Sequence, residues 1–71
     1  MNAKQWIAEY AQALGTEPPT THQFSQLLDL AGQAAHASER VAAPVACWVA
    51  ARAGVPPDQA LEVARQVASD G

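Results

Sequence analysis

The sequence has little that would support a site built on sulfur or on positive charge. Its single cysteine, Cys47, cannot form a disulfide within the chain or a zinc site of several cysteines, which is typical of a reducing compartment. The chain has a net charge of −3, and its four cations are scattered: Lys4, Arg40, Arg52 and Arg65. Because phosphate binding needs clustered lysine and arginine side chains, we expect no nucleic-acid partner.

Long apolar runs and catalytic motifs are absent as well. No run approaches the ~20 residues that a membrane-spanning helix needs, and Met1–Gln5 lacks the apolar stretch of a signal peptide. We therefore expect a cytoplasmic protein without a membrane partner. The sequence has no glycine-rich phosphate loop, no nucleophile elbow and no HExxH motif. We predict no catalytic residue, no metal site and no cofactor, and enzymatic activity, although left open, is not favoured.

Alanine dominates what the sequence does contain. Of the 71 residues 49% are apolar, but seventeen of these are alanine and only sixteen are large. Alanine loses no side-chain entropy in a helix and lets helix axes approach closely. A chain of this length is near the lower size at which one apolar core holds a domain folded. We therefore predict a single all-α domain over residues 1–71, a compact four-helix bundle with a thin core.

Apolar periodicity and cap residues define the predicted helices. Their approximate ranges are 2–14, 21–38, 44–53 and 57–69. Asn2 is a suitable N-cap for the first, and Thr20 and Gln23 fit a capping box before the second. Gly15 and Gly54 are placed to end the first and third helices in the left-handed conformation.

The predicted helices differ in the faces that they bury. The third begins at Pro44 and is apolar almost all round, so we predict that it is the buried axis. The first and fourth are predicted to be amphipathic covers. The buried stripe of the second helix is predicted to contain Phe24, Leu27, Leu28, Ala31, Ala34 and Ala35. All four aromatic side chains are predicted to lie in the core: Trp6, Tyr10, Phe24 and Trp48.

A polar stripe at the carboxyl end of the second helix is the candidate binding site. Asp29, His36 and either Glu39 or Arg40 share one helical face. Asp29 and His36 are roughly 10 Å apart along the axis, so a ligand site would need the 38–44 segment to fold back over them. The predicted ligand-binding residues are Asp29, His36, Glu39 and Arg40. Structural alternatives remain open: a solvated face, or His36 and Arg40 capping the end of the helix.

Cys47 lies beside Trp48 in the most apolar of the predicted helices. A thiol buried there has a raised pKa and little reactivity. No histidine lies at a local spacing that would activate it, so we predict a packing role.

Several short motifs resemble those of a known family. They are the run Leu28-Asp29-Leu30-Ala31, then Ala35-His36, Glu39-Arg40, Ala42-Ala43-Pro44-Val45 and Gly54. The chain is similar over nearly its whole length to a small bacterial domain of unknown function from high-GC species. That family occurs alone or together with proteins of molybdopterin-guanine dinucleotide biosynthesis. The resemblance implies a process, molybdenum-cofactor biosynthesis, and no mechanism.

These observations favour a small non-catalytic accessory or protein-interaction domain that docks through an exposed helix face. The alternative is a small-ligand or metal-binding domain that uses the Asp29, His36 and Arg40 face. A homodimer whose alanine-rich faces pack across a two-fold axis is compatible with the first hypothesis. The expected partner is therefore another protein or a second copy of the chain.

Overall fold

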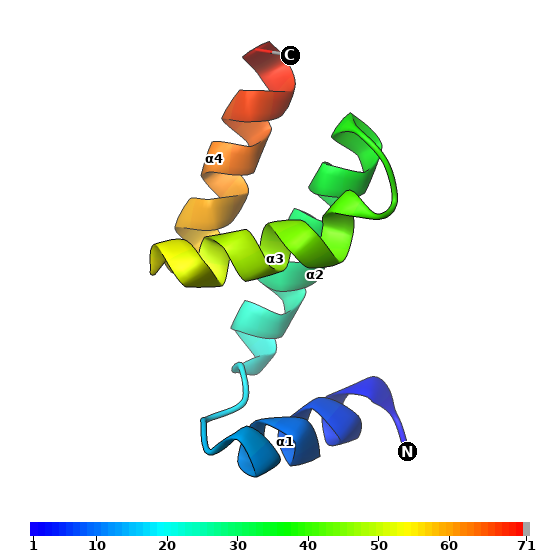
Figure 1. Ribbon diagram of the computed structural model, residues 1–71, viewed down its shortest axis with the longest axis vertical. Helices are drawn as coiled ribbons and strands as arrows, with labels where there is room; N and C mark the ends of the chain where they lie inside the picture. The colour runs from blue at the N-terminus through cyan, green and yellow to red at the C-terminus, as the bar shows by residue number, and fades with distance from the viewer. Residues whose placement is uncertain (71) are drawn as a thin grey trace.

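The computed structural model describes residues 1–70, and within them the protein is all-α, with four helices and no strand. The helices are α1 (Ala3–Leu14), α2 (Thr21–Ala37), α3 (Ala42–Ala53) and α4 (Pro57–Asp70) (Figure 1). The predicted all-α four-helix fold is confirmed. No helix in this part of the chain has both the length and the apolar character needed to cross a bilayer.

Side chains fix the start of α1 and of α2 through two capping boxes. Asn2 Oδ1 accepts a hydrogen bond from the Gln5 N–H at 2.9 Å, and Gln5 Oε1 accepts one from the Asn2 N–H at 3.0 Å. Thr20 and Gln23 exchange the same pair of bonds, at 3.0 and 2.9 Å. Both boxes satisfy N–H groups that have no partner inside the helix, so the predicted helix starts are confirmed.

Glycines end α1 and α3 as predicted. Gly15 and Gly54 have φ values of 78° and 76°, the left-handed region that a Cβ atom disfavours. After Gly54 the chain turns back, and the Val55 N–H donates to the Ala50 carbonyl at 3.4 Å. Val55 then packs against the core, which completes a Schellman motif.

The start of α3 differs from the prediction by two residues. The helix begins at Ala42, and Pro44 occupies its third position. The N–H groups of Ala42 and Ala43 donate to the carbonyls of Glu39 and Arg40, at 3.0 and 3.1 Å. Because N–H groups in the first turn have no acceptor within the helix, a proline there loses no hydrogen bond.

α2 is the central helix, because both α3 and α4 pack against it (Figure 1). The buried cluster joins Leu30 of α2 to Ala60 and Leu61 of α4, with Cys47 and Ala50 of α3 packed beside it. α3 itself has no buried residue. The prediction that α3 is the buried axis is therefore wrong: its apolar character comes largely from alanine, and only one of its sides meets another helix.

The buried face of α2 is rotated from the predicted one. Leu30, which lies outside the predicted stripe, is 3% exposed, whereas Leu28, which lies inside it, is 61% exposed. The helix is in contact with neighbours on two sides, so the face that contains Leu27, Leu30 and Ala34 is covered. Periodicity within α2 alone could not show where α3 and α4 would pack.

α1 does not cover the core. None of the residues in the buried cluster or packed on it comes from α1, which lies against the amino-terminal end of α2. There the Lys4 ammonium lies 5.8 Å from the centre of the Phe24 ring.

The prediction of core positions for Trp6, Tyr10 and Trp48 is wrong, since all three are exposed, and Phe24 is half-buried.

Candidate functional site

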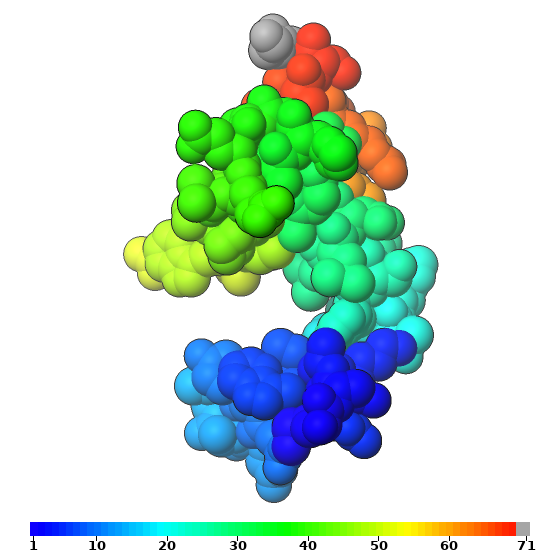
Figure 2. Space-filling view, turned by 90° about the vertical axis from the view of Figure 1, so that its right-hand side faces the viewer, coloured from blue at the N-terminus to red at the C-terminus, as the bar shows by residue number. Residues whose placement is uncertain are grey.

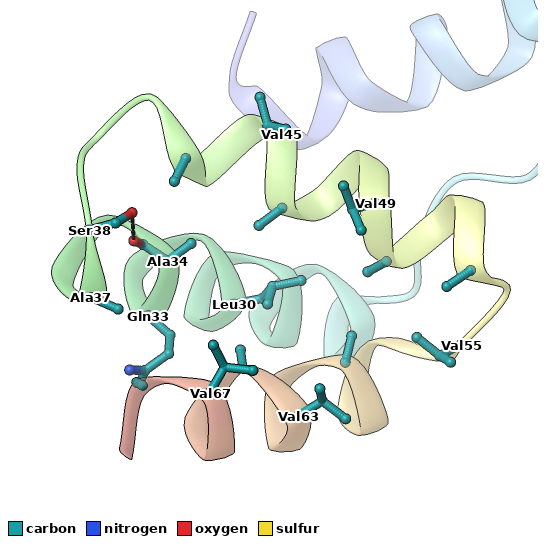
Figure 3. Close-up of a pocket in the computed structure, with 17 residues that line it drawn as sticks. Leu30, Gln33, Ala34, Ala37, Ser38, Val45, Val49, Val55, Val63 and Val67 are labelled. Atoms are coloured by element: carbon teal, nitrogen blue, oxygen red, sulfur yellow. Dashed lines mark hydrogen bonds between the residues drawn. The ribbon is translucent and has the colours of Figure 1, made fainter. Parts of the chain in front are cut away.

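An open apolar groove lies between α3 and α4, with α2 as its floor (Figure 3). Its volume is about 780 Å³, and none of its lining residues is charged. The lining residues are Leu30, Gln33, Ala34, Ala37, Ser38, Ala42, Val45, Ala46, Val49, Ala50, Ala53, Val55, Ala60, Val63, Ala64, Val67 and Ala68. We call this surface the α3–α4 groove.

Valine side chains form the two walls of the α3–α4 groove. Val45 and Val49 come from α3, Val63 and Val67 from α4, and Leu30 lies on the floor between them (Figure 3). The four valines are exposed, although branched apolar side chains are normally buried in a domain. Each wall pair is spaced i, i+4, which places both members on one face of its helix. A contiguous apolar surface of this kind is characteristic of a binding site.

The polar atoms of the groove lie at the carboxyl end of α2. The Ser38 hydroxyl donates to the Ala34 carbonyl at 3.0 Å, and the Ser38 N–H donates to the same carbonyl at 3.1 Å (Figure 3). Ser38 thereby caps α2, which is one of the roles that the sequence suggested for Arg40. The hydroxyl is already bonded within the chain, so the groove offers mainly apolar contact to a partner.

α1 carries a second exposed apolar surface. Trp6, Tyr10 and Leu14 follow one another at i, i+4 and i+8, and all three are exposed. The Trp6 and Tyr10 rings stack with their centroids 5.0 Å apart. In the space-filling view α1 forms a lobe that stands apart from the rest and joins it through the start of α2 (Figure 2). We call this surface the α1 face.

The predicted ligand-binding residues lie on open surface. Asp29, His36, Glu39 and Arg40 are all exposed, and none of them lines the α3–α4 groove. His36 lies in the last turn of α2. Among residues 1–70 no group of three or more His, Cys, Asp or Glu side chains could hold a metal ion. A ligand-binding role for these four residues stays a prediction.

The sequence predicted other positions for the residues that form the α3–α4 groove. Val45 and Val49 belong to the helix that was predicted to be buried, and Val67 belongs to the fourth helix, which was predicted to be an amphipathic cover. The repeated i, i+4 valine pairs are the signal that could have marked both walls. What the sequence could not show is that α3 and α4 leave these pairs uncovered.

Cys47 faces the core as predicted. Its thiol donates to the Leu27 carbonyl of α2 at 3.9 Å, and the side chain is half-buried. Burial raises the pKa of the Cys47 thiol above its ordinary value, because the thiolate would lose solvation there. The predicted low reactivity follows, since the thiolate is the nucleophilic form.

Alkylation of Cys47 by iodoacetamide should therefore reach its half-maximal rate at a higher pH in the folded chain than in the same chain unfolded by urea. Because the folded thiol keeps its proton when the unfolded thiol has lost it, stability should also fall as the pH rises above the ordinary thiol pKa. Alkylation reactions that are quenched at set times and analysed by mass spectrometry give the alkylation rates. A midpoint at the same or a lower pH in the folded chain would contradict this assignment.

A family model described as a domain of unknown function (DUF6457) matches residues 1–70. The match extends over all four helices of the described structure. No curated protein and no solved structure matches the chain. The description of the family names no ligand, reaction or partner, so the function has to be argued from the surfaces of the protein.

Proposed function

The chain belongs to the DUF6457 family of domains of unknown function, and we propose that it acts as a non-catalytic accessory domain that binds protein through exposed apolar helix surfaces. The observation that carries this proposal is the α3–α4 groove, a charge-free hollow of about 780 Å³ walled by exposed valines. Apolar grooves between helices are typical receptors for another protein's apolar side chains.

The thin core supports the same proposal. Among the residues whose burial the structure describes, only Ala11, Leu30, Ala60 and Leu61 are buried, and two of these are alanine. Two apolar surfaces, the α3–α4 groove and the α1 face, remain in water at the same time. Covering either one with a protein partner removes apolar area from water, which is the dominant favourable contribution to most protein association.

For the process, we propose molybdenum-cofactor biosynthesis in the bacterial cytoplasm. The support is the resemblance of the pattern Asp29, Ala35-His36, Arg40 and Ala43-Pro44 to a family that accompanies proteins of molybdopterin-guanine dinucleotide biosynthesis. An accessory domain of this kind would dock onto one of those proteins and assist maturation or delivery of the cofactor. It would supply contact area and would not take part in the chemistry.

A binding titration with purified proteins tests the proposal. The full chain is titrated with the molybdopterin-guanine dinucleotide biosynthesis protein of its own host, alongside a Trp6→Glu variant for the α1 face and a Val67→Glu variant for the groove. At least one variant should weaken binding about tenfold or more, because a buried carboxylate without a partner costs more than 1.4 kcal/mol.

Two controls show which surface matters. Val41→Glu changes an exposed valine outside both surfaces and should leave affinity unchanged. A double variant, His36→Ala with Arg40→Ala, removes the polar stripe. If only this double variant abolishes binding, the polar stripe is the site and the apolar surfaces are not. Absence of any binding by the native chain would reject the molybdenum-cofactor partner.

A further inference from the structure

We propose that the protein that fills the α3–α4 groove is a second copy of this chain, packed across a two-fold axis so that α3 and α4 of each copy meet those of the other. This inference rests on the proposed function, since it names the chain that occupies the groove. Three observations lead to it: the exposed area of the chain, the self-complementary shape of the groove, and the position of its charges.

The area left in water is larger than a folded monomer of this size should expose. A monomer of 7.4 kDa is expected to have an accessible surface of about 4,200 Å², whereas this chain has 5394 Å². The excess of about 1,200 Å² is greater than the roughly 800 Å² that each partner buries in a stable interface. Burying roughly 800 Å² against one partner would remove about two thirds of this excess.

The shape of the groove is suited to a surface like itself. On α4 the valine ridge formed by Val63 and Val67 runs beside a row of small residues at Ala60, Ala64 and Ala68. Ridges of side chains spaced i, i+4 pack into the shallow rows between the ridges of a facing helix.

α3 repeats this design, with the row of Val45, Val49 and Ala53 beside a row of alanines at Ala42, Ala46 and Ala50. In a two-fold pair the valine ridge of each copy can lie against the alanine row of the other, because the same patch serves both copies. The protein thus carries the ridge and its complement on one surface.

Charge favours a second copy over an unrelated partner. Two chains of charge −3 repel each other, but the groove lining holds no charged residue, so the contact brings no like charges together. Glu62 and Arg65 of α4 lie instead around a separate shallow hollow with Gln66 and Ser69. A partner of different sequence is usually oriented by complementary charges, whereas in a symmetric pair the two-fold axis sets the register.

Sedimentation velocity of the full chain over a range of concentrations tests the inference. The native chain should sediment with twice the monomer mass of 7.4 kDa. Val67→Glu should weaken self-association on the order of 100-fold, because its carboxylate would be buried without a counter-charge. Val67 is 65% exposed in the single chain, so the folded monomer does not depend on it.

Val41→Glu is the matched control, since Val41 is 70% exposed and lies outside the groove. It should sediment as the native chain does. Circular dichroism checks that each variant is helical, and if Val67→Glu is unfolded, Val49→Glu on the opposite wall takes its place in the comparison.

A native chain that stays monomeric at all concentrations would overturn the inference, and so would a dimer that the groove variants leave intact. The result that rejects the dimer differs from the result that rejects the proposed function. In the first case the chain is a monomer that still binds another protein through the groove or the α1 face. In the second the chain pairs with itself, yet neither surface variant changes the binding of any partner in the titration described above.

Discussion

Replacing Leu30 with alanine is expected to lower the free energy of unfolding by about 2 to 5 kcal/mol. Leu30 is 3% exposed and joins α2 to Ala60 and Leu61 of α4, with Cys47 and Ala50 of α3 packed beside it. A domain of this size has roughly 5 kcal/mol or less to lose. The variant should therefore unfold at a much lower urea concentration than the native chain.

Leu28→Ala is the matched control for this change, because it removes the same atoms from the same helix. Leu28 is 61% exposed, and its loss should change the free energy of unfolding by about 0.5 kcal/mol or less. Urea unfolding followed by far-ultraviolet circular dichroism measures both variants at one protein concentration. Equal losses at the two positions would show that the buried face of α2 is not the one described.

The second large effect concerns two glycines and has opposite signs at the two sites. Gly32→Ala should raise the free energy of unfolding by about 0.5 to 1 kcal/mol, because Gly32 lies inside α2 and alanine restricts the unfolded chain. Gly54→Ala should lower it by about 1 to 2 kcal/mol, because Gly54 has a φ of 76° that a Cβ atom disfavours.

Comparing Gly32→Ala with Gly54→Ala separates the effect of backbone conformation on stability from the effect of side-chain packing. A Cβ atom added at Gly32 or at Gly54 meets nothing within 4 Å, so neither substitution causes a clash. Thermal unfolding of the two variants should therefore move the midpoint in opposite directions from that of the native chain. A decrease for both would contradict the placement of Gly32 in the open interior of α2.

The helix ends could be predicted because the residues that set them act on their own neighbours. Asn2, Thr20 and Gln23 bond to backbone groups within three residues, and Gly15 and Gly54 need only their own φ angle. Each of these interactions therefore involves residues within one helical turn of each other. The start of α3 was misjudged because Pro44 is accepted at any position of the first turn, so the proline alone did not fix the boundary.

The faces of the helices were harder to predict because burial depends on what lies opposite. α3 is apolar all round, and a helix of that kind is normally buried, yet Val45, Trp48 and Val49 remain exposed because α1 packs elsewhere. The same reason applies to the α3–α4 groove, which exists only because α3 and α4 both pack on α2 and leave their valines uncovered. The raised pKa of Cys47 was predicted correctly, but the burial that raises it comes from α2 and the buried cluster, since its local neighbour Trp48 is exposed.

The polar stripe shows the limit of reasoning from one helix. Asp29 and His36 share a face of α2, as their spacing requires, but spacing does not say whether a second element faces them. The turn that holds Glu39 and Arg40 leads directly into α3. All four side chains are exposed, so a ligand would have to be held at an open surface.

Both tryptophan side chains are exposed, and this determines which structural changes tryptophan fluorescence can detect in this protein. Trp6 lies on the α1 face and Trp48 on the outer side of α3, and neither lines the groove or packs on the buried cluster. Indole rings that already contact water emit much as they do in an unfolded chain. Closure of the groove by a second copy should therefore change tryptophan fluorescence less than docking of a protein on α1 does.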